Sequence, residues 1–315
     1  MTTPALLPDT LCYLNGDYTP LKDAKISVLD RGFIFGDGVY EVLPVYAGRF
    51  FRFAHHMARL DRGLAELRIA NPLTHQRWHD IATKLVAERI NNTRAPALNH
   101  NASGPVDSPL PDQIIYIQIS RGVAMRDHIM PPDLQPTVFM MVNAMKLPSD
   151  AQRASGVACV TASDFRWDKA HIKSTSLLGA VFSRQISADV GALETIMFRG
   201  DYLSEAAASN VWVVKAGKLM GPLKDNKVLE GIRYGLYEEL CHAHGITFEL
   251  RPITRAEVLD ADEILLSSAT KEVLPVTLLD GVKVGHGSHA GLPGPVYAKL
   301  YAAYQQAKAA LPAPV

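Results

Sequence analysis

Two segments in the N-terminal part of the chain place apolar residues every three or four positions. The first, "AHHMARLDRGLAELRI" (residues 54–69), would form the apolar side of a helix from Met57, Leu60, Leu64 and Leu67. The second is "THQRWHDIATKLVAERI" (residues 74–90), in which Thr74 is suited to cap the helix N-terminus. This spacing is typical of amphipathic helices with one buried face. We therefore predict a helix over each segment.

Apolar runs of a different kind predict strands on either side of these helices. Residues 11–53 mix strand-like runs with turn residues, and "LCYLNGDYTPL" contains Asn15-Gly16, a strong hairpin signal. Further strand-like runs are "QIIYIQISRG" (113–122), "TVFMMVNAM" (137–145), "VACVTASDFRW" (157–167), "ETIMFRGDYLSEA" (194–206) and "NVWVVKAGKLMGP" (210–222). Later helices are expected at about 175–190, 231–244 and 295–310. Because strands and helices do not alternate regularly, the pattern predicts an α+β fold of mixed sheets and meanders with packed helices.

The length of 315 residues allows two domains of ordinary size, each with its own core. The segment "KLPSDAQRASG", residues 146–156, is the best candidate for a linker. We therefore predict an N-terminal α+β domain at 1–145 and a C-terminal α+β domain at 157–315. Residues 91–112 are rich in Asn, Pro, Gly and Ser with little periodicity, which predicts a long, mobile surface loop.

Charge and cysteine content exclude several classes of protein. Lys+Arg and Asp+Glu both number 32, so the net charge is zero, which argues against a nucleic-acid or membrane-surface partner. The cysteines are widely spaced and form no CxxC pattern, so neither a disulfide framework nor a metal site is expected: Cys12, Cys159 and Cys241. No signal peptide is recognisable, and no run approaches the roughly 20 apolar residues that a membrane span needs. These features predict a cytoplasmic globular protein.

The stretch "HIKSTSLLGAV", residues 171–181, places Lys173 at the end of an apolar, strand-like run and just before a predicted helix. Such a lysine is either a solvated cation at a strand end or an amine held in a site. An amine in a site can act as a base or form an imine with a carbonyl group. Imine chemistry with pyridoxal phosphate (PLP) also needs a phosphate cradle, a carboxylate beside the pyridine nitrogen and a partner for the substrate carboxylate.

Three other segments contain candidates for these roles. "YLSEAAASNVW" (202–212) places Glu205 among small residues that would let a flat ring approach closely; the alternative is a solvated acid at a strand end. "VLEGIRYGLYEEL" (228–240) is a turn with Gly231 that leads into a helix, and it either cradles a phosphate or simply starts that helix. "LLSSATKEV" (265–273) is rich in small residues and hydroxyls, and its alternative is an ordinary polar turn. Taken singly, these segments do not decide between the two interpretations.

Six segments, in order and near the expected spacing, resemble the fold type IV PLP-dependent transaminases. They are "DRGFIFGDGVYEVLPVY" (30–46), "HMARLDRGLAELRI" (56–69), "RWDKAHIKSTSLLGAV" (166–181), "LSEAAASNVW", "LEGIR" and "SSATKEVLPV". The resemblance covers roughly residues 11–308. The blocks "RGFIFGDGVYEV" and "SRGVAMRDH" are most similar to those of D-amino-acid transaminases. The resemblance implies a two-domain α+β fold, PLP as cofactor, and a homodimer with active sites at or near the subunit interface.

By this resemblance, Lys173 would form the Schiff base with PLP and move the proton between the substrate Cα and the cofactor. Glu205 would pair with the pyridine nitrogen, and Arg59 on the first helix would bind the phosphate. The other implied contacts to the cofactor are the backbone amides of Ile232 and Arg233, together with Ser268 and Ala269.

Tyr40, Arg126 and His128 match the residues that hold the substrate α-carboxylate in this family. In these dimers the neighbouring subunit supplies the arginine and the histidine. Arg166 matches an outer position near the lysine. Taken alone, Arg126 and His128 could be surface residues and Arg59 an ordinary helix residue, but the shared pattern favours the site.

The chain departs from the family pattern at several positions. Ala206 to Ala208 stand where these enzymes often have serines, which removes hydroxyls near the ring or the phosphate. Arg233 and Ala269 stand where many have threonines, so only backbone contacts carry over there. Pro44 stands where one branch has lysine, and it can reshape the side-chain pocket.

The sequence therefore predicts a transaminase that moves the amino group of a D-amino acid to a 2-oxo acid by a ping-pong route. The Arg-x-His pattern at 126 and 128 is what favours D-amino acids. The alternatives are an (R)-selective amine transaminase, a branched-chain L-amino-acid transaminase, a PLP lyase or a non-catalytic PLP-binding protein. A lysine enzyme without a cofactor is a further alternative.

Overall fold

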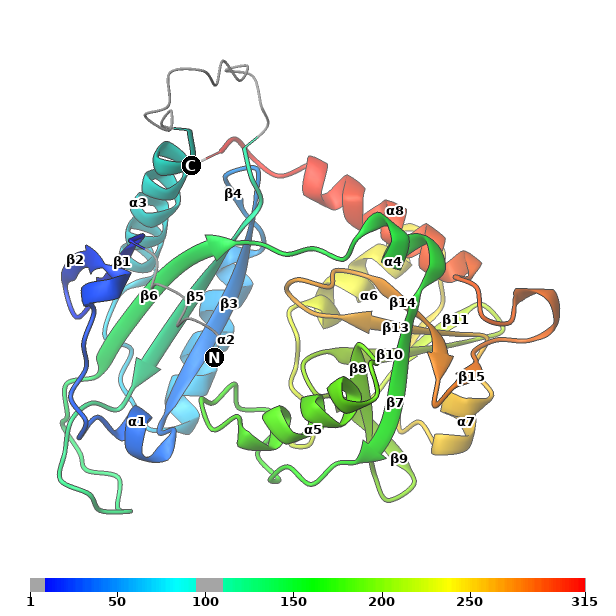
Figure 1. The fold of residues 1–315 in the computed structure, drawn as a ribbon, viewed down its shortest axis with the longest axis horizontal. Helices are drawn as coiled ribbons and strands as arrows, with labels where there is room; N and C mark the ends of the chain where they lie inside the picture. The colour runs from blue at the N-terminus through cyan, green and yellow to red at the C-terminus, as the bar shows by residue number, and fades with distance from the viewer. Residues whose placement is uncertain (1–8, 95–109, 315) are drawn as a thin grey trace, which may run out of the picture. The chain divides into compact units, whose positions relative to one another are not determined.

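The fold is that of a computed structural model, which describes residues 9–94 and 110–314 (Figure 1). Most of the loop predicted at 91–112 lies outside the described residues. Residues 91–94 extend the preceding helix instead, and residues 110–112 lead into a strand.

The described residues divide into two compact units. Unit 1 is drawn from Met1–Met145, Lys173–Ser176 and Leu311–Val315, and unit 2 from Lys146–Ile172 and Leu177–Ala310. Each unit has its own sheet and its own buried core. The change of unit after residue 145 coincides with the end of the predicted N-terminal domain.

Unit 1 is built on an antiparallel sheet with the strand order β2-β1-β6-β5-β3-β4. Its strands are β1 (Leu11–Leu14), β2 (Asp17–Pro20), β3 (Gly38–Tyr46), β4 (Arg49–Phe50), β5 (Gln113–Ser120) and β6 (Thr137–Ala144). The predicted hairpin forms where Asn15 adopts a positive φ and β1 pairs with β2. β5 alternates buried and half-buried residues, as expected for a strand with one face on the core.

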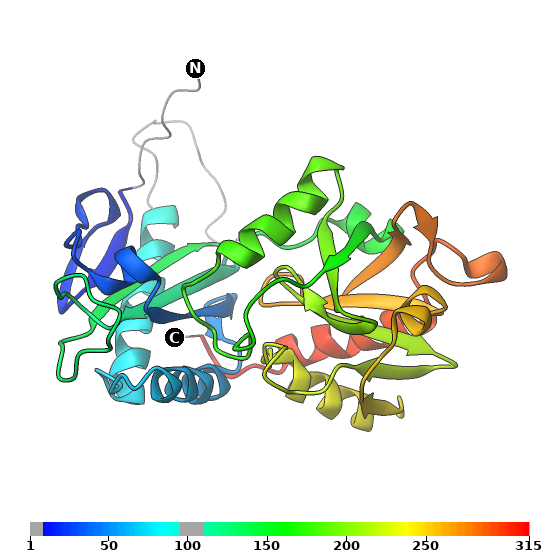
Figure 2. The ribbon, with the colours of Figure 1, turned by 90° about the horizontal axis from the view of Figure 1, so that it is seen from below.

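The helices of unit 1 are η1 (Leu21–Asp23), α1 (Arg31–Phe35), α2 (Phe53–Glu66) and α3 (His75–Arg94), and the two long ones cover the sheet. α2 packs on β3, and α3 packs on β1 and β6 (Figure 2). The two amphipathic helices predicted at 54–69 and 74–90 are present, and the predicted apolar side of the first is buried.

Unit 2 is built on a mixed sheet with the order β12-β11-β10-β13-β14-β7-β8-β9, and β15 pairs with β14. Its strands are β7 (Val157–Ser163), β8 (Glu194–Arg199), β9 (Tyr202–Ala206), β10 (Asn210–Lys215), β11 (Lys218–Gly221), β12 (Phe248–Leu250), β13 (Glu263–Ser267), β14 (Leu274–Leu279) and β15 (Val282–Lys283). β7 pairs in parallel with both β8 and β14, whereas β10 pairs antiparallel with β13. This mixture confirms the predicted α+β class.

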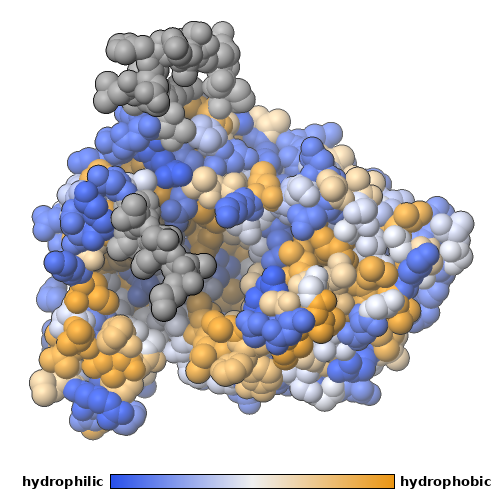
Figure 3. Space-filling view, viewed as in Figure 1, coloured by the Kyte–Doolittle hydropathy of each residue, from blue (hydrophilic) through white to orange (hydrophobic). Residues whose placement is uncertain are grey.

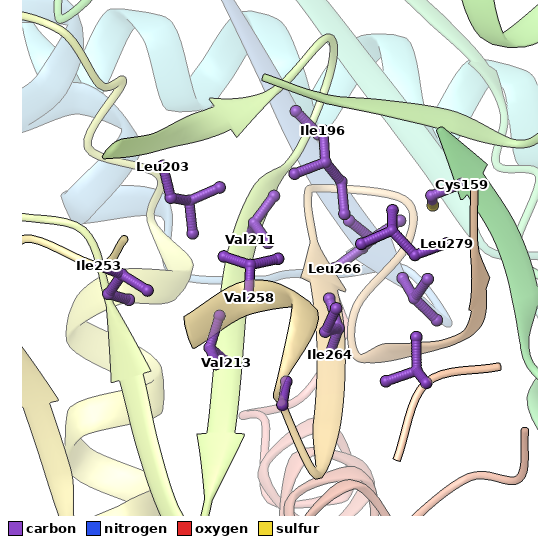
Figure 4. Packing of buried hydrophobic residues seen from close by; sticks show 14 of the residues in the cluster. Cys159, Ile196, Leu203, Val211, Val213, Ile253, Val258, Ile264, Leu266 and Leu279 are labelled. Carbon is purple, nitrogen blue, oxygen red and sulfur yellow. The ribbon is translucent and has the colours of Figure 1, made fainter. Parts of the chain in front are cut away.

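The helices of unit 2 are α4 (Asp150–Ser155), α5 (Leu178–Asp189), α6 (Arg233–Ala243), α7 (Arg255–Leu259), η2 (Gly287–His289) and α8 (Pro295–Ala309). α5 lies on one side of the sheet, and α6 and α8 lie on the other (Figure 2). Apolar residues of the central strands and α7 form a buried cluster, which includes Val211, Val258 and Leu266 (Figure 4). In the part of the chain that is described, no helix is both long and apolar enough to cross a membrane.

The segment predicted as a linker, residues 146–156, is structured and belongs to unit 2. It contains α4, whose N-terminus is stabilised by a capping box. Ser149 Oγ accepts from the Gln152 backbone amide, and Gln152 Oε1 accepts from the Ser149 backbone amide. The turn residues that suggested a linker are the N-cap and the C-cap of this short helix.

Candidate active site

Lys173 lies in an irregular segment between β7 and α5, not at the end of a strand as predicted. Its carbonyl oxygen accepts a hydrogen bond of 3.0 Å from the Tyr40 amide, and Ser174 forms an isolated bridge with Val39. These contacts to β3 place the lysine in unit 1 and not in the predicted domain at 157–315. Its half-buried Nζ lies 4.2 Å from the centroid of the Tyr40 ring, within reach of a cation–π interaction.

The residues after Lys173 attach to the turn that follows α1. Gly36 ends α1 with a left-handed φ of 65°, and a Cβ placed there would lie 2.7 Å from Ser176 Oγ. The hydroxyls of Thr175 and Ser176 donate to the Gly36 carbonyl at 2.9 and 3.0 Å. A glycine at this position is therefore required both by the turn and by the close approach of the lysine segment.

Arg59, the predicted phosphate ligand on α2, belongs to a buried cluster with Glu41 and His56. Its Nε and Nη2 donate to the two carboxylate oxygens of Glu41 at 2.7 and 2.8 Å, and His56 Nδ1 lies 2.7 Å from Glu41 Oε2. Burial raises the pKa of Glu41. The charge and hydrogen bonds of Arg59, with the hydrogen bond of His56, outweigh burial and hold that pKa well below its usual range.

The predicted carboxylate ligands Arg126 and His128 lie in an exposed loop of unit 1. Both side chains contact the ring of Phe35 at the end of α1. Tyr40, the third predicted ligand, is half-buried on β3 and lies beside Tyr116, with ring centroids 5.8 Å apart. Burial raises the pKa of Tyr116 to about 12.

Glu205 is buried on β9 of unit 2, so the alternative of a solvated strand-end acid is wrong. Arg166 Nη1 donates to its Oε1 at 2.5 Å, and Asn210 Nδ2 donates to its Oε2 at 3.1 Å. The Leu229 amide lies 3.3 Å from both oxygens. A buried carboxylate requires such donors, because its charge is otherwise costly to remove from water.

Arg166, predicted near the lysine, is shared between two carboxylates of unit 2. Its Nε and Nη2 donate to Asp164 at 2.9 and 2.8 Å, while only Nη1 donates to Glu205. Burial raises the pKa of Asp164, but the hydrogen bonds and charge of Arg166 outweigh it and lower that pKa to about 2. For Glu205 burial dominates over the attraction of Arg166 and raises the pKa to about 7. The arginine therefore neutralises Asp164 more completely than Glu205.

The strand that carries Glu205 is joined to the predicted phosphate turn by Asn210. Asn210 Nδ2 donates to Glu205 and also to the Leu229 carbonyl, the latter at 2.9 Å. A Cβ on Gly231 would lie 2.1 Å from Asn210 Oδ1, so this turn requires glycine. The "LEGIR" turn is thus held against β10 by one buried amide side chain.

The two segments predicted to bind phosphate contact each other. Ile232 is the N-cap of α6, and Arg233 begins the helix. Arg233 Nη2 donates to the Ala269 carbonyl at 3.2 Å and to the Tyr304 hydroxyl at 2.8 Å. Ser268 Oγ accepts from the Lys271 amide at 3.1 Å, which stabilises the second turn. Unit 2 therefore brings the start of α6 and the turn after β13 together.

Ser209, the hydroxyl that remains after the three alanines, is bound elsewhere. It donates to Glu194 Oε2 at 3.1 Å, and that oxygen also accepts from Lys271 Nζ at 2.9 Å. Ser209 and Glu194 are buried. Through Glu194, Ser209 and Lys271 therefore connect the turn that follows Ala206 to Ala208 with the turn after β13.

Sequence reasoning assigned no role to Glu41, Asp164 or Asn210. Glu41 is the one acid inside the apolar run "VYEVLPV", and an acid in a buried strand needs a cationic partner. Asp164 stands two residues before Arg166, a spacing at which the carboxylate can accept from the following backbone and side chain. The partners of Glu41, by contrast, lie 15 and 18 positions away and could not be found from the pattern.

The model of the amino-transferase class IV family matches residues 38–279 of this chain. The chain belongs to the class IV aminotransferases. Members of this family depend on PLP, so the predicted PLP-dependent aminotransferase is confirmed.

This class IV aminotransferase is similar to known proteins over nearly its whole length. It is 32% identical over 290 residues to a D-alanine aminotransferase of Listeria monocytogenes serotype 1/2a, covering 91% of this chain and 92% of that protein. It is 31% identical over 292 residues to one of Staphylococcus haemolyticus, covering 92% and 95%. The crystal structure of a branched-chain aminotransferase from Thermoproteus uzoniensis has a TM-score of 0.80 at 22% identity and covers 94% of both chains. The structural likeness confirms the fold type IV architecture.

The described residues of this aminotransferase fit PLP chemically. Glu205 is a carboxyl whose pKa burial raises to about 7, and Arg166, which also binds Asp164, offsets this rise only in part. Such a carboxyl suits a partner that brings a proton or a positive charge, as the pyridine nitrogen of PLP does. The N-terminus of α6 provides backbone amides of the kind that phosphate groups bind.

Proposed function

We propose that this aminotransferase transfers the amino group of a D-amino acid to a 2-oxo acid. The observation that carries the proposal is the similarity to D-alanine aminotransferases at 31–33% identity over about nine-tenths of the chain. The solved branched-chain aminotransferases are only 20–22% identical and support the shared fold alone. The free, buried cysteines among the described residues support a cytoplasmic location as part of the same proposal.

Lys173 is the proposed amine for the Schiff base with PLP and the proposed proton carrier at the substrate Cα. PLP supplies an electron sink that stabilises negative charge at that carbon. The backbone contacts of the lysine segment to β3 support this role, because they fix the main chain from which the amine projects. The nearby Tyr40 ring limits the positions that Nζ can take.

Glu205 is the proposed partner of the pyridine nitrogen. Its contacts with Arg166, Asn210 and the Leu229 amide hold the carboxyl in one orientation. The proposed phosphate ligands are Arg59, Ser268, Ala269 and the amides of Ile232 and Arg233. The bidentate contact of Glu41 orients the guanidinium of Arg59, and the Arg233–Ala269 hydrogen bond orients the two turns.

Tyr40, Arg126 and His128 are the proposed ligands of the substrate carboxylate, with the last two supplied to the neighbouring subunit of a homodimer. A guanidinium offers a carboxylate two parallel hydrogen bonds, which suits this role. Exposed apolar side chains support a homodimer. They include Val28, Phe33, Met125 and Ile129 on and near α1, and Leu178, Val181 and Phe182 on α5. Figure 3 shows apolar surface on one face of the molecule.

A half-reaction test measures the proposed donor specificity directly. The holoenzyme is mixed separately with D-alanine, L-leucine and (R)-1-phenylethylamine, and the change in cofactor absorbance is followed over a single turnover. We expect D-alanine to react fastest. Sedimentation of the same sample should give twice the chain mass of 34.4 kDa.

Lys173→Ala is the matched control, because it removes the proposed catalytic amine and is measured with the same three donors. This variant should show no multiple turnover with any donor, since both imine exchange and proton transfer are lost. A faster reaction with L-leucine or the amine would contradict the D-amino-acid assignment. Turnover of the lysine variant near the wild-type rate would contradict the assignment of Lys173.

A further inference from the structure

The first half of the loop that carries Arg126 and His128 is attached to the first residue of α1 and to the two residues before it. Its backbone contacts are the hydrogen bond from Arg31 N to Gly122 O at 2.9 Å, the hydrogen bond from Ala124 N to Leu29 O at 3.3 Å, and a bridge between Asp30 and Val123. Side chains beyond Ala124 are exposed up to Met130. The attachment therefore ends just before the two proposed ligands.

A buried arginine extends the attachment into the exposed half of the loop. Arg31 Nη1 donates to the carbonyl of Asp127, the residue between the two ligands, at 2.5 Å. Its Nε donates to Asp37 at 2.8 Å, and Asp37 also accepts from Arg121. The Arg31 side chain is thus fixed at both ends, and it holds the backbone between the ligands.

The ring of Phe35 lies against both ligand side chains. The Cζ atom of Arg126 is 5.6 Å from its centroid, and the ring of His128 is 5.3 Å away with an interplanar angle of 46°. The Cζ atom of Arg31 lies 4.8 Å from the same centroid. One aromatic side chain at the end of α1 therefore contacts both proposed ligands and the arginine that holds their backbone.

Such a contact matters because an exposed arginine samples many rotamers, and ordering it opposes ligand binding. A phenylalanine ring has only two side-chain torsions, and its face attracts a guanidinium. A side chain that already rests on this ring loses less freedom when it binds a carboxylate. The benefit is confined to substrates that carry a carboxylate.

We propose that Phe35 is a positioning residue for carboxylate recognition, which orders Arg126 and His128 before the substrate binds. The inference rests on the proposed roles of these two residues as carboxylate ligands. Phe35 acts through them and not on the reacting atoms. Its removal therefore weakens the binding of amino acids and leaves the chemistry at the amine unchanged.

The test compares holoenzymes of the wild type and Phe35→Leu with D-alanine and with (R)-1-phenylethylamine. Leucine keeps apolar volume at the end of α1 but removes the aromatic face. We expect KM for D-alanine to rise about threefold to tenfold with kcat nearly constant, because two weak aromatic contacts are lost. The rate with the amine, measured over a single turnover, should not change.

Two further variants control for damage to the fold. Phe35→Tyr keeps the ring and should restore the wild-type KM for D-alanine. Phe50→Leu is the matched control at another phenylalanine. The Phe50 ring also packs on a histidine, with its centroid 5.1 Å from that of His79, but Phe50 lies on β4 and not on α1. We expect Phe50→Leu to leave KM for both substrates unchanged.

An unchanged KM for D-alanine in Phe35→Leu would overturn the inference, and so would equal losses for D-alanine and the amine. A loss that Phe35→Tyr does not restore would also overturn it, since the ring would not be the cause. A wild type that does not use D-alanine contradicts the proposed function itself, and the inference with it. A wild type that uses D-alanine while Phe35→Leu matches it contradicts only the inference.

Discussion

Glu41 in unit 1 and Glu205 in unit 2 are both buried and both contact an arginine, yet their pKa values shift in opposite directions. Glu41 receives two hydrogen bonds from Arg59 and one contact from His56, and its pKa is held well below its usual range. Glu205 receives a single hydrogen bond from Arg166, whose other edge binds Asp164, and burial raises its pKa to about 7.

The difference shows how the sharing of one arginine sets the charge of a buried acid. A bidentate partner compensates the loss of hydration, whereas a shared partner compensates only part of it. Glu41 is therefore a permanent anion that orients Arg59. Glu205 remains an acid whose charge depends on a further partner, which suits the proposed contact to a pyridine nitrogen.

The largest expected difference between the two acids is in catalysis. Glu205→Gln should slow the D-alanine half-reaction by about two to four orders of magnitude, because it removes the charge that keeps the pyridine nitrogen protonated. Glu41→Gln, the same change at the other buried acid, should act mainly on the affinity for PLP. Single-turnover rates at saturating PLP measure this, and equal rate losses in both variants would break the comparison.

The next effect is on stability. Glu41→Gln leaves the buried Arg59 without its bidentate anion, so the apoprotein should lose about 3 kcal/mol in its free energy of unfolding. Urea unfolding of the apoprotein measures this loss. Asp9→Asn is the control, since the Asp9–Lys22 pair in the same unit is largely exposed and should matter by less than about 1 kcal/mol. A loss no larger than that of the control would show that Glu41 is not ionised.

The smallest expected effect is the pH dependence that Glu205 gives to the apoprotein. Its pKa is about 7 when folded and about 4.5 when unfolded, so between these values the folded state binds more protons. The stability of the wild type should therefore fall as the pH rises from 4.5 to 7, by at most about 3 kcal/mol. The difference in stability between the wild type and Glu205→Gln isolates this contribution, and a constant difference across the range would contradict it.

Much of the fold could be predicted, because local periodicity carries the information. The helices of residues 54–69 and 74–90 and the strands at 113–122 and 137–145 were found, since one face of each is buried. The segment 146–156 was interpreted as a linker because the cap residues of a short helix resemble those of a loop.

The sequence proposes site residues but not their surroundings. Family motifs point to Lys173, Glu205 and Arg59 as candidates, whose roles stay predictions, and the partners that set their environments lie far away in sequence. The hydrogen bond from Arg166 to Glu205 spans 39 positions, and the attachment of the lysine segment to β3 crosses the boundary of the predicted domains. Such pairings depend on tertiary structure, and local patterns carry no signal for them.

The titration of Glu205 is the most direct test of whether a shared arginine leaves this buried acid protonated. Infrared spectra of protein with isotope-labelled glutamate, recorded from pH 4 to 9, follow its carboxyl in the apoprotein, and subtraction of Glu205→Gln identifies its band. We expect a midpoint near pH 7 that is retained in Glu41→Gln, and conversion to the carboxylate when PLP is added at pH 6. A Glu205 carboxyl that titrates near pH 4.3, as ordinary glutamates do, would contradict this expectation. A carboxyl band that does not change when PLP is added would contradict it as well.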